Sequence, residues 1–278
     1  MDENNFFRVY GAQGPSRRRS YQKSVVVDDM WSFDFVGIDT TLTPGPKRPF
    51  NFFGSLTEHQ FSEVDQILSA SKNSSGLVTF GHYPLSTVIS PNPGIKSLVG
   101  RSGADAYLSG HLHDLVFGLG RDLYAKQSEG YLDIELGDWK DNRHFRLMAF
   151  DHGHLSFIDL IYEKDQPPNQ AVLITNPLDA RFVYGSKMAS AFTSMARSTH
   201  VRALVFAPPG SEPKVEALID SGGPALEMKR AEEGKPLFVG AWDPKKYNDS
   251  KLHTLNVTVT TKSGSTSHVM QFATDLSG

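Results

Sequence analysis

Residues 105–113 read DAYLSGHLH: an apolar run ends at a glycine, and His111 and His113 follow two positions apart. Residues 76–83, GLVTFGHY, repeat the layout with His82 after the glycine. Each stretch predicts a strand that is followed by a histidine just beyond its C-terminal end. In layered α/β folds, the loops at this end of the strands form the ligand-binding sites. Glycine lacks a Cβ and lets other groups approach closely. Because neutral imidazole is the commonest nitrogen ligand of zinc, iron and manganese, the tandem layout predicts that the three histidines converge at a metal site.

The segments around these two stretches alternate between strands and helices. Residues 24–27 and 31–38 are rich in β-forming side chains and predict two strands. Residues 56–70, LTEHQFSEVDQILSA, carry apolar side chains at helical spacing, and Thr57 is a suitable N-cap. A short helix is expected over residues 94–100. The first half of the chain therefore predicts an α/β arrangement.

The next segment predicts a β-hairpin. Residues 145–162, FRLMAFDHGHLSFIDLIY, read as two strands around a turn at Asp151-His152-Gly153, and Gly153 suits a positive φ. His152 and His154 could also serve as ligands, but the turn is the favoured interpretation. Residues 163–170, EKDQPPNQ, are polar and contain prolines, which indicates a linker.

Beyond the linker the chain predicts a small β-sandwich. Short runs rich in β-formers are separated by Gly, Pro, Asn and Asp, and Leu255, Val257 and Val259 alternate with polar residues as in a strand with one buried face. Residues 188–197, MASAFTSMAR, are ambiguous and fit a helical insertion.

Composition excludes several classes of protein. The 278 residues carry 28 Lys and Arg against 31 Asp and Glu, a formal net charge of −3, which argues against a nucleic-acid binder. The absence of cysteine excludes disulfides and thiolate metal sites. We expect a soluble chain without signal peptide or membrane helix, because the start is acidic and no apolar run reaches about 18 residues. Glycosylation-type triplets at Asn73, Asn248 and Asn256 permit a lumenal location.

The motifs GHYP at His82 and GHLH at His111 and His113 resemble the last two motifs of calcineurin-like metallophosphoesterases. The segments FVGIDTTLTPGPKRPFNFFG, ELGDWKDNR and RLMAFDHG further resemble the transmembrane protein 62-like branch of that family. The resemblance implies a two-metal site that holds manganese, iron or zinc and hydrolyses phosphoesters. It implies that His82 and His111 ligate the second metal and His113 the first. Two close cations can polarise a phosphate and acidify a bound water.

The resemblance also implies the domain organisation. Residues 1–164 would form part of a four-layer phosphoesterase sandwich with flanking helices, and residues 165–278 an immunoglobulin-like sandwich. Members of the branch are membrane-associated or lumenal, and their membrane segments have no counterpart here.

The earlier motifs of the family, D-x-H, G-D-x-x-D and G-N-H-D/E, do not occur before His82. Asp39 in GIDTT aligns with a strand that carries no ligand, and residues 137–141, GDWKD, are interpreted as a strand end and turn. We therefore expect a truncated metal-dependent phosphoesterase whose substrate the sequence does not name, and which is inactive as this chain alone. The alternative is a non-catalytic fragment or binding module that acts through the immunoglobulin-like domain.

Overall fold

The computed structural model describes residues 19–42, 44–47, 50–112, 124–163 and 170–275. The chain divides into two compact units, unit 1 over residues 1–138 and unit 2 over residues 139–278. The predicted linker falls largely outside the described residues, and the predicted domain boundary at residue 164 stays a prediction.

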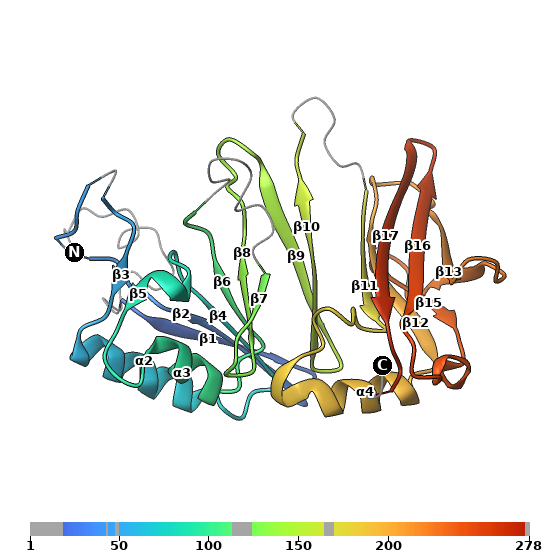
Figure 1. Ribbon diagram of the computed structural model, residues 1–278. Coiled ribbons are helices and arrows are strands. Elements are labelled where there is room, and N and C mark those ends of the chain that lie inside the picture. The colour runs from blue at the N-terminus through green and yellow to red at the C-terminus, as the bar shows by residue number, and fades with distance from the viewer. Residues whose placement is uncertain (1–18, 43, 48–49, 113–123, 164–169, 276–278) are drawn as a thin grey trace. The chain divides into compact units, whose positions relative to one another are not determined.

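Unit 1 is built on a six-stranded sheet with the order β1-β2-β4-β6-β8-β7 (Figure 1). The four inner strands β2, β4, β6 and β8 are parallel, whereas β1 and β7 lie antiparallel at the two edges. A ribbon of β3 and β5 stands apart from this sheet. The strands are β1 (Tyr21–Val27), β2 (Trp31–Gly37), β3 (Gly54–Ser55), β4 (Gly76–Phe80), β5 (Val88–Ile89), β6 (Ala106–Ser109), β7 (Tyr124–Lys126) and β8 (Leu132–Glu135).

Two helices of unit 1, α2 (Glu58–Ala70) and α3 (Ile95–Arg101), connect consecutive parallel strands, and a 3-10 turn, η2, spans Leu85–Thr87. Helix α2 begins where the sequence predicts. The Thr57 side chain accepts from the backbone N–H of Gln60, and the Gln60 side chain accepts from the N–H of Thr57. This reciprocal capping satisfies two donors that a helix start leaves unpaired.

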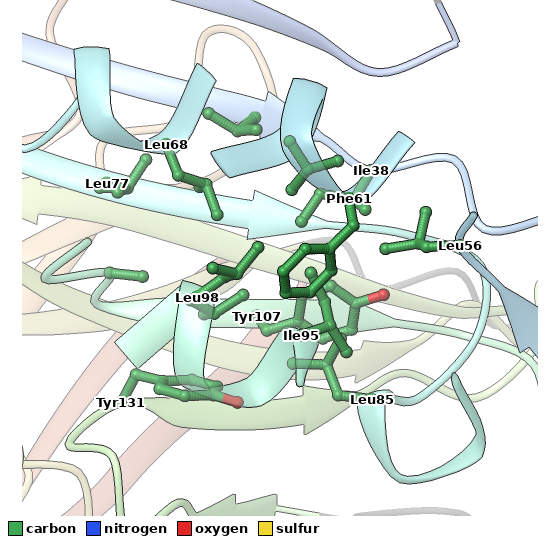
Figure 2. Packing of buried hydrophobic residues seen from close by; sticks show 14 residues of the cluster. Ile38, Leu56, Phe61, Leu68, Leu77, Leu85, Ile95, Leu98, Tyr107 and Tyr131 are labelled. Atoms are coloured by element: carbon green, nitrogen blue, oxygen red, sulfur yellow. The ribbon is translucent and has the colours of Figure 1, made fainter. Parts of the chain in front are cut away.

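The core of unit 1 lies between the sheet and these two helices (Figure 2). Phe61, Val64 and Leu68 of α2 fall at helical spacing and are buried, and Leu98 of α3 is fully buried. Tyr107 from β6 is also fully buried in this cluster. Burial of apolar area on this scale is the main stabilising contribution to unit 1. The predicted strands and helices of the first half are thus confirmed within two residues, except that β1 begins three residues before the predicted start at residue 24. Strands β3, β5 and β7 were not predicted.

Unit 2 begins with the hairpin of β9 (His144–Asp151) and β10 (His154–Ile161). The turn between them has positive φ at His152 and at Gly153, as the predicted hairpin requires. Across the two strands, Arg146 donates two hydrogen bonds of 2.6 Å to the Asp159 carboxylate. The predicted hairpin is confirmed.

The rest of unit 2 is a seven-stranded sheet with the order β11-β12-β15-β14-β13-β16-β17. Strand β14 pairs with β15 on one side and with β13 on the other, so it joins two groups of strands whose apolar side chains share one core. The strands are β11 (Ala171–Asn176), β12 (His200–Phe206), β13 (Lys214–Ile219), β14 (Leu226–Arg230), β15 (Leu237–Ala241), β16 (His253–Thr261) and β17 (Gly264–Phe272).

The ambiguous segment of unit 2 is helical. Helix α4 spans Met188–Arg197, preceded by the 3-10 turn η3 (Gly185–Lys187), and a further turn, η4, spans Pro244–Tyr247. Leu255, Val257 and Val259 are fully buried, which confirms the alternation read from the sequence.

The chain is therefore built mostly of β-sheet with few helices. The more specific expectation, a four-layer phosphoesterase sandwich, stays a prediction. Within the described ranges, no helix is long and apolar enough to span a bilayer.

Candidate functional site

The candidate site of unit 1 lies at the C-terminal edge of the parallel strands. Strands β4 and β6 are hydrogen-bonded neighbours, and His82 and His111 each follow one of them after a glycine. The pairing continues past the strand ends, because Gly81 N–H donates to the Leu108 carbonyl and Gly110 N–H to the His82 carbonyl. The two histidines are consequently held at adjacent positions of one edge.

Gly81, the residue before His82, lies too close to neighbouring atoms to carry a side chain. A Cβ on Gly81 would collide with the Tyr107 hydroxyl and would lie 2.9 Å from the Ile38 carbonyl oxygen. The Tyr107 hydroxyl donates a 2.7 Å hydrogen bond to the Tyr83 carbonyl oxygen. Glycine therefore lets a buried hydroxyl reach the backbone of the GHYP loop and fix it beside the strand end.

The His82 and His111 side chains face each other. His111 Nδ1 lies 2.9 Å from His82 Nε2, and the ring centroids are 4.8 Å apart. The Tyr83 ring lies 4.9 Å from His82 and 4.5 Å from His111, centroid to centroid. A hydrogen bond between two ring nitrogens needs a proton on one and a lone pair on the other, so at least one imidazole is neutral in this arrangement.

Glu135, at the end of β8, positions the GHLH loop. Its Oε1 accepts a 2.6 Å hydrogen bond from the Leu112 backbone N–H, directly after His111. The carboxyl is almost completely buried. Sequence reasoning missed this residue, although Asp133 and Glu135 in the otherwise apolar run YLDIEL were a signal, because buried carboxylates are rare without a partner.

The buried carboxylates of β8 stand in an unusual electrostatic environment. Burial raises the pKa of Asp133 to about 6, against a lowering by the Lys96 charge, and the neighbouring charge of Glu135 raises it further. Burial likewise raises the pKa of Tyr107, with a second contribution from Asp133, so its hydroxyl stays a neutral donor. Perturbed carboxyl groups of this kind are enriched at functional sites.

A pocket of about 310 Å³ opens beside His82 between the ends of β2 and β4. Its walls include Tyr21, Ile38 and Phe80, with Arg19 and Asp39 among the polar lining residues.

Asp39 in this pocket is held by neighbouring donors. Its Oδ2 accepts a 2.8 Å hydrogen bond from Arg19 Nε, and its Oδ1 accepts from the backbone N–H and the hydroxyl of Thr41. Burial by itself would raise the pKa of Asp39, but these hydrogen bonds and the Arg19 charge lower it below its usual value. Both oxygens therefore already have partners.

Of the three predicted ligands, the structure brings His82 and His111 together, and His113 lies outside the described residues. In the described part of the chain, no group of three or more histidine and acidic side chains is arranged to hold a metal ion. The metal assignment therefore stays a prediction. Residues 137–141 follow the end of β8 as an irregular bend, in agreement with their interpretation as a strand end and turn.

Comparison with known families identifies part of the chain. Residues 166–276 match the family model described as the TMEM62 Ig-like domain, so an immunoglobulin-like domain occupies most of unit 2. A curated mouse protein, transmembrane protein 62, is 35% identical over 260 residues, which cover 94% of this chain and 38% of the mouse protein. The predicted relationship to the transmembrane protein 62-like branch is thereby confirmed.

A second relative connects the chain to phosphoesterases. A putative metallophosphoesterase of Arabidopsis thaliana is 31% identical over 220 residues, which cover 64% of this chain and 29% of that protein. The chain spans less than half the length of either relative. Among solved structures, a Cellulomonas fimi endo-beta-1,4-mannanase double mutant matches with a TM-score of 0.26 and 22% identity, over 39% of this chain and 19% of that one.

Proposed function

We propose that this chain contributes metal ligands to a metal-dependent phosphoesterase, with His82 and His111 on one divalent ion and His113 on a second. The observation that carries the proposal is the 2.9 Å contact between the ring nitrogens of His82 and His111 at adjacent strand ends. The relationship to a putative metallophosphoesterase supports phosphoester hydrolysis as the reaction class.

The geometry of the pair fits two ligands of one ion. Two nitrogens bound at about 2.1 Å with angles between 90° and 109° would lie roughly 3.0–3.4 Å apart. The observed 2.9 Å is close to the lower end of that range. Binding would remove the proton now shared between the rings, because a metal needs both lone pairs. A bound cation would supply Lewis acidity toward a phosphate oxygen or a water.

The other residues of the edge have positioning roles in this proposal. Glu135 holds the backbone after His111, and the Tyr107 hydroxyl holds the backbone after His82. The pocket beside His82 would receive the organic part of a phosphoester against Tyr21 and Phe80. Arg19 is already paired with Asp39, so this pocket contributes shape rather than a ligand.

The first test measures metal binding alone. Isothermal titration with manganese or zinc should give a binding isotherm that His111→Ala weakens at least about tenfold, since one of few ligands is lost. His59→Ala is the matched control, because His59 is an exposed histidine on α2 of the same unit. Equal affinity of the His111→Ala variant and the control would exclude the proposed ligand pair.

The second test measures turnover. Purified chain, with added manganese, zinc or iron and an aryl phosphodiester, should show no useful hydrolysis, because no D-x-H or G-N-H motif precedes His82 in these 278 residues. Without a bridging carboxylate, the distance between two cations and the position of the attacking water are not fixed. Metal-dependent turnover that His111→Ala abolishes would show that the ligands present suffice.

The second candidate function is binding through the immunoglobulin-like domain without catalysis. It is favoured by a separate observation, a cationic pocket within unit 2 that has no part in the phosphoesterase proposal.

A further inference from the structure

Unit 2 contains a second polar pocket, of about 380 Å³, between the hairpin turn, the end of α4 and the first part of β12. It is lined by His152, Asn176, Ser194, Arg197, Ser198, Thr199, His200 and Arg202. None of these side chains is acidic, and four of them are basic. The volume falls in the range of pockets that hold small organic ligands.

Asp151 fixes one wall of the pocket. Its Oδ2 accepts hydrogen bonds from Arg202 Nε at 2.7 Å and from the Thr175 hydroxyl at 2.6 Å, and its Oδ1 accepts from His152 Nδ1 at 2.7 Å. Burial by itself would raise the pKa of Asp151, but the hydrogen bonds from Arg202 and Thr175 and the nearby positive charges lower it. The ionised carboxylate therefore orients Arg202 and His152 at the pocket.

This arrangement leaves donors available to a ligand. Arg202 uses only Nε toward Asp151, and in the described structure its two terminal nitrogens form no other hydrogen bond. The Thr199 hydroxyl lies 2.8 Å from His200 Nδ1, and a hydroxyl that donates there places the His200 proton on Nε2. His152 Nε2 becomes a further donor when that ring is protonated.

Arg197 gives the pocket its excess positive charge. The side chain is exposed in the last turn of α4 and has no ion pair or hydrogen bond among the described residues. Asp151 offsets Arg202, whereas nothing in the pocket lining offsets Arg197. The C-terminal end of α4 carries a partial negative charge of roughly half a unit, which is smaller than the full charge of the guanidinium.

We infer that this pocket binds a phosphate monoester, as a free small molecule or as a lipid headgroup. A phosphate monoester carries close to two negative charges at neutral pH and three acceptor oxygens, which match two guanidinium groups, an imidazole N–H and the Ser194 hydroxyl. The planar fork of arginine suits phosphate oxygens in particular. The remaining volume, lined by hydroxyl and amide groups, accommodates a short polar group on the ester oxygen.

The experiment titrates the full chain with glycerol 3-phosphate, and with glycerol as the uncharged control, by isothermal titration calorimetry. A parallel arm measures flotation of the chain with phosphatidylcholine vesicles that do or do not contain phosphatidic acid. Both arms contain a chelator, so that the metal site proposed for unit 1 cannot contribute. Binding of glycerol 3-phosphate identifies a free ligand, and binding to phosphatidic acid vesicles alone identifies a headgroup.

Two variants decide whether the pocket is responsible. Arg197→Gln should weaken binding about tenfold, the equivalent of one charge-assisted hydrogen bond. Lys262→Gln, which removes an exposed positive charge from the β16–β17 turn of the same unit, should change affinity less than about twofold, because distant surface charges are screened. Circular dichroism verifies that each variant folds. If Arg197→Gln does not fold, Arg202→Lys, which keeps a charge beside Asp151, replaces it in the same comparison with Lys262→Gln.

The inference is wrong if the wild-type chain binds neither probe. It is equally wrong if Arg197→Gln and Lys262→Gln bind with the same affinity, because the Arg197 charge would then contribute no more to binding than a positive charge elsewhere on the surface.

Discussion

The pKa values of two buried carboxyl groups, one in each unit, are shifted in opposite directions. In unit 1, burial raises the pKa of Asp133 to about 6, and the charge of Glu135 on the same strand adds to the effect. In unit 2, Asp151 is buried to a similar degree, yet the hydrogen bonds and charge of Arg202 bring its pKa below the usual value. The difference lies in the partners, since burial acts in the same direction on both.

The two carboxylates therefore contribute to the stability of their units with opposite sign. Asp133 reduces the stability of unit 1 when it ionises, while Asp151 stabilises unit 2 in its ionised form. Buried polar groups that lower the stability of a fold are characteristic of functional sites. The candidate metal ligands lie in unit 1, whose stability is lowered by the ionised Asp133, and the immunoglobulin-like domain lies in unit 2.

The largest expected effect tests whether the two units unfold separately. Leu255→Ala opens a cavity in the core of unit 2, where Leu255 is fully buried, and should lower its free energy of unfolding by about 3 kcal/mol. Hydrogen–deuterium exchange with mass spectrometry should show faster exchange in β13, β16 and β17 but unchanged exchange in β4 and β6. Val269→Ala on the neighbouring strand, where Val269 is 54% exposed, is the control and should have little effect. Equal loss of protection in both units would break the comparison.

The second prediction compares the two carboxylates directly. Because the pKa of Asp133 is raised, its ionisation destabilises unit 1 as the pH rises from about 4 through about 6. Asp133→Asn should remove this loss and stabilise unit 1 at pH 8 by on the order of 2 kcal/mol. Asp151→Asn should destabilise unit 2 at the same pH, on the order of 2 kcal/mol, because Arg202 loses its charged partner.

Exchange protection of each unit at pH 5 and pH 8 measures both effects in one experiment. Effects of the same sign for Asp133→Asn and Asp151→Asn would show that the partners do not determine the difference between the carboxylates.

The smallest expected effect concerns His253 of unit 2. Burial lowers the pKa of His253, but hydrogen bonds and charges from Asp220 and Asp249 outweigh this and raise it above the usual value. The stabilisation is therefore complete below about pH 6.5 and is lost as the pH rises through the raised pKa. Thermal unfolding should show that His253→Gln destabilises unit 2 by ~1 kcal/mol at pH 5.5 and by less at pH 9.

His59→Gln, at an exposed histidine of unit 1 that forms only a surface ion pair with Glu63, is the control and should change the free energy of unfolding by less than about 0.5 kcal/mol. A cost of His253→Gln that stays constant between pH 5.5 and pH 9 would mean that the histidine acts through packing and not through its charge.

Local sequence patterns predicted those elements whose signals lie within one segment. Helix α2 was predicted from its apolar spacing and the Thr57 cap, and the hairpin of β9 and β10 from its turn chemistry. Strand β14 was missed because LEMKR has little apolar alternation, although it pairs with the strands that directly precede and follow it in the chain. The contact of Glu135 with the Leu112 N–H was missed for a different reason, because 23 positions separate the two residues and no local pattern records their contact.

The sequence by itself determined that His82 and His111 each follow a glycine at the end of a buried strand, because strand periodicity and glycine placement are local properties. Only the tertiary structure decided that β4 and β6 are parallel neighbours, and that His82 Nε2 and His111 Nδ1 lie 2.9 Å apart. The order of strands in a sheet depends on the burial of side chains from the whole unit, and here α2 and α3 cover the sheet that brings the two ends together.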